Sequence, residues 1–255
     1  MTKFLKILIL TFLGAVTITS CSDDSDGIPG WPWNDNSTEK PDEPDVAEAK
    51  PRYIWIDAAA NFPDYANSKE NIAKDMEKIK AAGFTDIIVD VRPTTGDVLF
   101  NTNVVDQVKR MDVWGNSGYS YYERTETWDY LQAFIEEARI QGLKVNASIN
   151  TFVGGYLCPY NLGHDGVLFR DESKKGWASV ANLADGLTNT MDLLDDETDY
   201  GAKFFNPAND DVQNFVLQLL ADLAKYDLDG IILDRCRYDD YGLESDFSDI
   251  SKQKF

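Results

Sequence analysis

The sequence predicts an α/β fold of the (β/α)8 TIM-barrel type, with only about the first four βα units present in the chain. Four short apolar runs alternate with three segments of helical periodicity, an order typical of a parallel sheet. Each run also ends in a polar or charged residue. The runs are YIWID (53–57), DIIVDVR (86–92), KVNASIN (144–150) and GIILD (230–234).

The first 21 residues have the layout of a secretory signal, with Lys3 and Lys6, an apolar run, and small or hydroxylated residues up to Cys21. Cys21 lies where a lipoprotein signal peptidase would cut and a lipid would be attached. The SDDSD that follows resembles an acidic signal that routes lipoproteins of one Gram-negative phylum to the cell surface. We therefore expect an outer-membrane lipoprotein exposed at the cell surface; an ordinary cleaved signal is the alternative.

Residues 22–50 are rich in acidic residues and proline and carry too little apolar surface to offset chain entropy, so they are expected to form a disordered stalk. Residues 51–255 are long enough for one core and are expected to form the N-terminal part of the barrel domain. The net charge of −20 argues against nucleic acid as a partner. Cys158 and Cys236 lack the spacing of a metal site, so no metal or cofactor is predicted, and they form either a disulfide or two buried thiols.

Three helices are expected between the four strands. The first is capped by Asn67 or Ser68 and closed by Gly83, the second runs from about Thr127, and the third starts near Asn209. The stretch DFSDISKQKF, at 246–255, resembles the start of a fourth helix.

The carboxyl ends of the strands carry the candidate site. In a (β/α)8 barrel the active site is built at this rim. The polar residues that end the predicted strands are Asp57, Asp90, Arg92, Asn150 and Asp234.

The connections after strands two and three are longer than a plain βα unit needs. They contain WGNSGYSYYERTETW (114–128) and FVGGYLCPYNLGHDG (152–166), with Trp177 beyond. Aromatic side chains mixed with hydroxyl and amide groups suit sugar rings, so Trp114 and Trp177 are predicted to contact a glycan. His164 and the acidic stretch 192–201 are interpreted as solvated features.

Glycoside cleavage uses one carboxylate that stabilises or attacks the developing oxocarbenium ion, and one carboxyl that protonates the leaving oxygen. Asp234 is the best candidate for the first role, because Arg235 and Arg237 would favour its charged form. A rim salt bridge is the structural alternative.

The chain resembles the glycosyl-hydrolase-like family 10 proteins, which are secreted bacterial (β/α)8 domains. The resemblance rests on RYIWID, GFTDIIVDVRPTTGDVLF (83–100), EEARIQGLKVNASINTF (136–152) and, above all, FFNPANDDVQNFVLQLLADLAKYDLDGIILDRCRYDD (204–240). It implies a glycan hydrolase whose pocket is lined by Arg92, Asn150, Asp234, Arg237 and Tyr238. Asp90 and Arg235 depart from the family pattern, which often has Gln and Asp there.

The predicted function is a surface-anchored glycoside hydrolase that acts on poly- or oligosaccharide, with Asp234 as its catalytic carboxylate. The second carboxyl is expected beyond Phe255, with Asp57, Asp90 and Asp97 as possible substitutes. A non-catalytic glycan-binding lipoprotein and a structural protein of the cell envelope are the alternatives.

Overall fold

The structure, a computed structural model, describes residues 50–115, 118–158, 163–193, 202–239 and 242–255. The predicted signal, Cys21, nearly all of the predicted stalk and most of the acidic stretch 192–201 lie outside these residues. No helix in the described part of the chain is long and apolar enough to cross a membrane.

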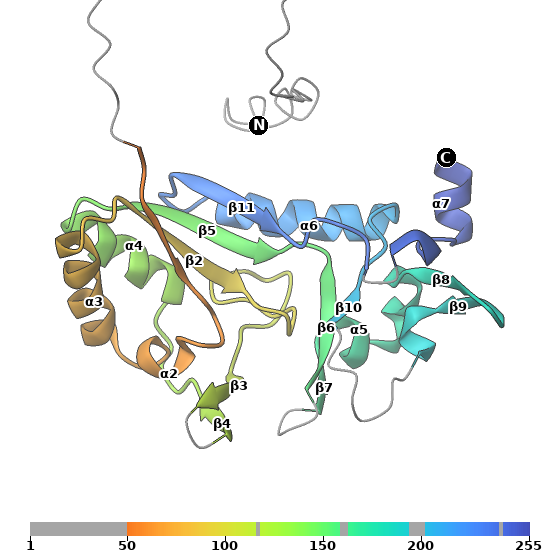
Figure 1. The fold of residues 1–255 in the computed structure, drawn as a ribbon, viewed down its shortest axis with the longest axis horizontal. Helices are drawn as coiled ribbons and strands as arrows, with labels where there is room; N and C mark the ends of the chain where they lie inside the picture. The colour runs from red at the N-terminus through yellow and green to blue at the C-terminus, as the bar shows by residue number, and fades with distance from the viewer. Residues whose placement is uncertain (1–49, 116–117, 159–162, 194–201, 240–241) are drawn as a thin grey trace, which may run out of the picture. The chain divides into compact units, whose positions relative to one another are not determined.

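A four-stranded parallel sheet forms the centre of the fold, in the order β1-β2-β5-β11. Figure 1 shows β2, β5 and β11 with their arrowheads in the same direction. The strands are β1 (Tyr53–Ile56), β2 (Asp86–Arg92), β5 (Lys144–Asn150) and β11 (Gly230–Asp234). All four predicted strands are therefore present, and their spatial order follows the chain, as it does in a barrel.

Three helices connect these strands: α3 (Lys69–Ala81), α4 (Tyr130–Ile140) and α6 (Asp210–Leu223). Ser68 and Asn209 cap α3 and α6 as predicted, because their side-chain oxygens accept hydrogen bonds from main-chain N–H groups in the first turns. The second helix begins three residues later than expected. The reason is that Asp129, whose side chain accepts from the N–H of Gln132, provides its cap.

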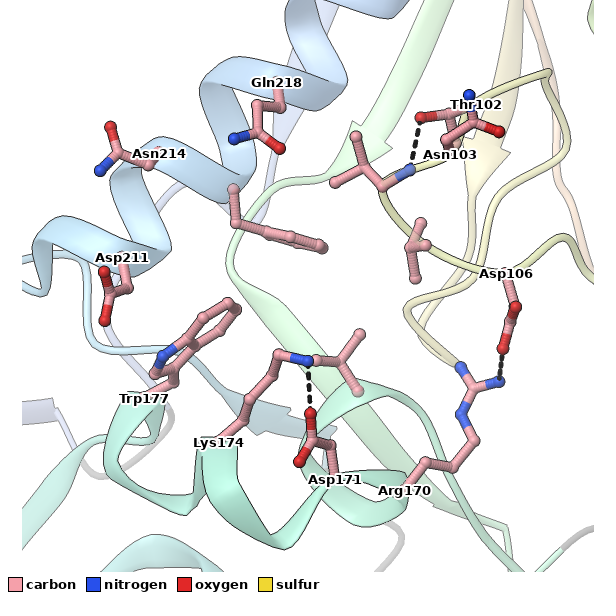
Figure 2. A pocket seen from close by; sticks show the side chains of 14 residues that line it. Thr102, Asn103, Asp106, Arg170, Asp171, Lys174, Trp177, Asp211, Asn214 and Gln218 are labelled. Atoms are coloured by element: carbon pink, nitrogen blue, oxygen red, sulfur yellow. Dashed lines mark hydrogen bonds and ion pairs between the residues drawn. The ribbon is translucent and has the colours of Figure 1, made fainter.

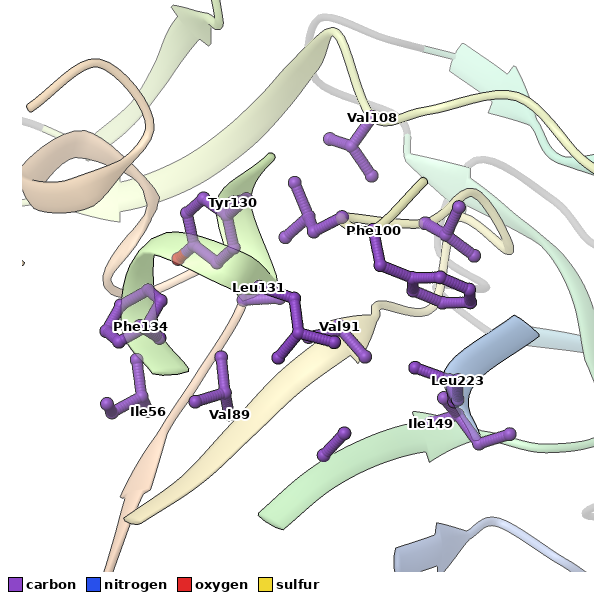
Figure 3. Packing of buried hydrophobic residues seen from close by; sticks show 14 of the residues in the cluster. Ile56, Val89, Val91, Phe100, Val108, Tyr130, Leu131, Phe134, Ile149 and Leu223 are labelled. Carbon is purple, nitrogen blue, oxygen red and sulfur yellow. The ribbon is translucent and has the colours of Figure 1, made fainter. Parts of the chain in front are cut away.

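The two faces of the sheet differ sharply. Side chains alternate between faces along a strand, and Ile56, Val89 and Ile149 belong to the face that packs on the helices (Figure 3). The opposite face carries Trp55, which is 44% exposed, whereas the next residue, Ile56, is 3% exposed. The helices therefore cover one face, and polar and aromatic side chains line the other.

The long connections contain structure that the sequence did not predict. Hairpins β3–β4 and β8–β9 are antiparallel, and a three-stranded sheet has the order β10-β6-β7. The strands are β3 (Arg110–Gly115), β4 (Gly118–Glu123), β6 (Val153–Cys158), β7 (Gly163–Asp165), β8 (Val180–Leu183), β9 (Gly186–Asn189) and β10 (Ala202–Phe204). The short helices are α2 (Phe62–Tyr65), α5 (Val167–Arg170), η1 (Glu172–Trp177), η2 (Thr190–Asp192), η3 (Gly242–Glu244) and α7 (Asp249–Lys254), the last being the predicted fourth helix.

The central sheet is open among the described residues, with β1 and β11 as its two edges. The mixed α/β class and the parallel sheet are confirmed. Closure into an eight-stranded barrel stays a prediction.

The register shifts between Asp90 and Arg92, where β2 pairs with β5. At this point two side chains bridge the strands reciprocally. The guanidinium of Arg92 donates to the carbonyl of Asn150, and the side-chain amide of Asn150 donates to the carbonyl of Arg92 at 2.7 Å. Because both side chains are buried, this pair fixes the ends of β2 and β5 where the regular ladder is interrupted.

Gly166 joins the connections that follow β2 and β5. Its φ is +112°, and a Cβ there would lie 2.4 Å from the carbonyl oxygen of Thr95 and 2.4 Å from the Cα of Gly155. Both contacts are main-chain atoms, which cannot rotate away. Only glycine therefore allows this approach.

We predict that Gly166→Ala destabilises the chain more than Gly186→Ala. Gly186 has a similar φ of +117°, but a Cβ at that position would meet nothing within 4 Å, so its substitution tests the backbone strain alone. That strain is worth about 1–3 kcal/mol, and Gly166→Ala should lose a further ~1–3 kcal/mol from the clash. Urea unfolding of both variants measures the difference. Equal losses of unfolding free energy in the two variants would show that the loops around Gly166 can move apart at no cost in stability.

Candidate functional site

The carboxyl ends of the four parallel strands bring three carboxyl groups to one side of the sheet. Ile56 is in register with Val89, so Asp57, the residue after β1, is level with Asp90 on β2. Asp234, at the end of β11, is paired with Asn150. By alternation Asp90, Asn150 and Asp234 point from the face away from the helices. Strands β2 and β11 are two strand spacings apart, roughly 10 Å.

Asp90 is the buried member of this group, at 8% exposure. Burial raises its pKa to about 7, against an ordinary 3.8, and the charges of Asp57 and Asp234 act in the same direction. Hydrogen bonds from the main-chain N–H groups of Arg92 and Ala58 oppose the rise. Asp90 is thus a carboxyl group that holds its proton up to about neutral pH.

Asp57 and Asp234 are exposed. Asp57 Oδ1 accepts hydrogen bonds from the N–H groups of Ala59 at 2.9 Å and Ala60 at 2.7 Å, which fixes it in the turn after β1. Asp234 Oδ1 accepts from the N–H of Arg235 at 2.7 Å. Arg235 has a φ of +44°, a left-handed conformation that is unfavourable for a residue with a side chain. Such strain is concentrated at functional sites.

Arg92 lies below the rim, fully buried. Its guanidinium donates to the carbonyls of Asn150 and, at 2.7 Å, Val153, and its centre lies 5.9 Å and 5.7 Å from the rings of Phe205 and Phe215. Burial lowers its pKa to about 10. The N–H groups of Arg92 that donate these hydrogen bonds point at main-chain carbonyls. Arg92 and Asn150 therefore position the strand ends.

The segment after β11 carries the other residues predicted at the rim. The guanidinium of Arg237 lies 5.0 Å from the ring of Phe204 and donates to the carbonyl of Tyr238 at 3.0 Å. Tyr238 is exposed. Cys236, between them, is a free thiol, and the prediction that such a thiol would be buried is wrong because its side chain is exposed. The side chains of Cys158, His164 and Trp114 lie outside the described residues.

Trp177 shares a cavity with other residues than the rim carboxyls. It lines a groove of about 850 Å³ between the loop at 102–106, α5, η1 and α6 (Figure 2). Its ring packs edge-on against Phe205 at 5.9 Å and at a tilt against Phe215 at 5.7 Å. Asp57, Asp90 and Asp234 do not line this groove.

A second cavity of about 490 Å³ lies between hairpin β3–β4 and Arg170. Arg170 contacts Asp97, Asp106 at 3.0 Å and Asp165 at 3.4 Å. Burial raises the pKa of Asp97 to about 6, although its hydrogen bond with Arg170 acts against the rise. Arg170 and Asp106 line both cavities.

Sequence reasoning proposed Asp97 only as a substitute acid and missed Arg170. The one feature of the sequence that pointed to Arg170 was its positive charge in a strongly acidic chain, which favours contacts with carboxylates. No group of three or more described His, Cys, Asp or Glu side chains is arranged to hold a metal ion.

The chain is similar to an S-layer-related protein of Niallia circulans, with 30% identity over 221 residues. The match takes in 83% of this chain but only 12% of that protein. No protein-family model matches the chain. Membership of the glycosyl-hydrolase-like family 10 therefore stays a prediction.

Two solved structures are similar at low identity. Alpha-L-fucosidase isoenzyme 2 from Paenibacillus thiaminolyticus matches with a TM-score of 0.46 and 20% identity, over 72% of this chain and 23% of the other. A hypothetical protein from Ruminiclostridium thermocellum matches with a TM-score of 0.45 and 10% identity, over 78% and 82%. TM-scores below 0.5 do not establish a common fold.

We predict that Asp90→Asn changes how stability depends on pH. The folded chain keeps the Asp90 proton up to about pH 7, whereas the ordinary pKa of 3.8 applies once the chain unfolds. The stability from this group is therefore fully present below about pH 4 and is lost as the pH rises through about 7. Asparagine cannot ionise, so the variant does not lose this stability. Between pH 5 and pH 8 its free energy of unfolding should rise relative to that of the wild type by on the order of 3 kcal/mol.

Urea unfolding at the two pH values measures this gain. Asp64→Asn, which neutralises an exposed carboxylate on α2, is the control. An equal pH dependence in the wild type and Asp90→Asn would mean that Asp90 ionises normally in the folded chain.

Proposed function

We propose that the rim of the parallel sheet hydrolyses glycosidic bonds, with Asp90 as the proton donor and Asp234 as the second carboxylate. One observation supports this most strongly: two carboxyl groups lie on the same face of the sheet at its strand ends, one buried with a pKa of about 7 and one exposed. Carboxyls in such different environments can take the acid and the base or nucleophile roles at one pH.

In this reaction the proton of Asp90 passes to the glycosidic oxygen as its bond to the anomeric carbon breaks. Because β2 and β11 are roughly 10 Å apart, there is room for a water molecule between the two carboxyls, as direct displacement requires. Asp234 takes a proton from this water as it attacks the anomeric carbon. Asp57, beside Asp90, helps to keep the acid protonated because its charge raises the pKa of Asp90. The acid of this proposal therefore lies within the chain, whereas sequence analysis expected it beyond Phe255.

The other rim residues support this arrangement in two ways. Arg92 and Asn150 hold the ends of β2 and β5, and thereby fix the position of Asp90. Arg235, Arg237, Tyr238 and Trp114 are proposed to contact the sugar, as the resemblance and the loop composition predicted.

The proposed setting is the cell surface, with the chain attached through a lipid on Cys21 to the outer membrane. The similarity to a protein named S-layer-related supports a place in the cell envelope. Poly- or oligosaccharides of the envelope or its surroundings are the proposed substrates. The same similarity favours a second candidate, a structural protein of the envelope that binds glycan without cleaving it.

Substitution of the rim carboxylates separates these candidates. We expect Asp90→Asn and Asp234→Asn each to lower the release of reducing ends from a polysaccharide substrate by about 10²–10⁴-fold, while Asp64→Asn leaves it unchanged. Each variant should still bind the glycan. Full activity in Asp90→Asn would exclude it as the acid, and binding without cleavage by the wild type would favour the structural candidate.

The pH profile provides a second test. Because the acid must be protonated, kcat/KM should fall above about pH 7, with a limb that reports the pKa of Asp90. The profile is measured from about pH 5 to about pH 9 with one substrate. A rate that stays constant up to the alkaline end of this range would contradict the assignment.

A further inference from the structure

The groove in Figure 2 differs in chemistry from the rim. One wall is a polar stripe of α6, formed by Asp211, Asn214 and Gln218. These positions are three and four residues apart, so they share one side of the helix. Figure 2 shows Trp177 across the groove from this stripe.

The charged groups of the opposite wall are largely satisfied by one another. Lys174 contacts Asp171 at 2.5 Å and lies 5.4 Å from the centre of the Trp177 ring. Arg170 is shared between its carboxylates, including Asp106 at 3.0 Å. By contrast, Asp211, Asn214 and Gln218 are exposed on α6 and offer donors and acceptors to a ligand.

Apolar surface completes the groove. Trp177 and Phe215 meet at 5.7 Å between ring centres, and Val104 and Val105 of the loop line the same hollow. A volume of about 850 Å³ is within the range of small-molecule sites. Aromatic and aliphatic surface beside amides and a carboxylate suits the C–H faces and hydroxyl groups of a sugar.

We propose that this groove is a second glycan-binding site, separate from the rim, and that it takes a neutral oligosaccharide. Sugar hydroxyls donate to Asp211 and exchange hydrogen bonds with the amides of Asn214 and Gln218, while the C–H faces of the sugar pack on Trp177, Val104 and Val105.

The charge of the groove selects against acidic glycans. Both cations that line it, Arg170 and Lys174, already contact carboxylates, and Asp211 adds a further negative charge. The chain as a whole carries −20. A uronate or sulfated sugar would therefore meet a repulsion that these paired cations do not offset.

Backbone and side-chain amide NMR signals of α6 test the proposal. The full chain with Asp234→Asn is titrated with cellohexaose, mannohexaose and chitohexaose, and with hexagalacturonate as the acidic comparison. Because this background removes the proposed rim carboxylate, the result does not depend on whether the rim cleaves glycans. At least one neutral hexasaccharide should shift the side-chain amide signals of Asn214 and Gln218 to saturation, and hexagalacturonate should not.

The double variant Asn214→Ala and Gln218→Ala should weaken this binding by about tenfold or more, because it removes the amides that bind the sugar hydroxyls. Both positions are exposed, and alanine favours a helix, so the fold is retained. Gln213→Ala removes an exposed amide outside the groove on the same helix and should leave the affinity unchanged. The proposal is overturned if no neutral hexasaccharide shifts these signals, if the double variant binds as before, or if hexagalacturonate binds more tightly.

Discussion

The packing of the helices on a single face of the parallel sheet is the constraint on which the rest of the structure depends. Helices bury the face that carries Ile56, Val89 and Ile149, so alternation sends the intervening side chains to the other face. Because parallel strands end at the same edge of a sheet, Asp90 and Asp234 lie at one edge with only β5 between their strands, although they are far apart in the sequence. The proximity of the two carboxyls is thus a consequence of topology, and the raised pKa of Asp90 follows from burial and from that proximity.

Burial of Asp90 requires a firm frame, and two features provide it. Arg92 and Asn150 exchange hydrogen bonds with each other's main chain where the register of β2 and β5 shifts. Gly166 lets the loop at Thr95 approach within contact of β6. A buried guanidinium beside two aromatic rings that are themselves in contact is an unusual core element, and its loss would leave carbonyl groups without donors. The buried guanidinium of Arg92 and the carboxyl of Asp90 lie two residues apart on β2, so the residue that holds the strand ends also fixes the position of the proposed acid.

The sequence predicted what local patterns determine. Strand runs, the caps at Ser68 and Asn209, and the order of elements depend on neighbours in the chain, and the structure confirms them. The antiparallel strands in the long connections depend on pairing between distant segments, such as β6 with β10, which periodicity does not reveal. The same limit applies to the site. The environment of Asp90 depends on Ala58 and Asp234, which distant segments supply, and Trp177 was grouped with the rim although it lines a separate groove.

The separation of the groove from the rim bears on how such a chain would act on a polymer. If the groove holds neutral sugar as proposed, it keeps the rest of the polymer close and raises the effective concentration of bonds at the proposed rim carboxylates. Arg170 makes this division possible in electrostatic terms, because it partly neutralises the carboxylates between the two cavities. Without that guanidinium, Asp97, Asp106 and Asp165 would repel one another and open the wall that the cavities share. In the two proposals, the charge pattern of the loops therefore limits where a glycan binds, and the sheet positions the carboxyls that would act on it.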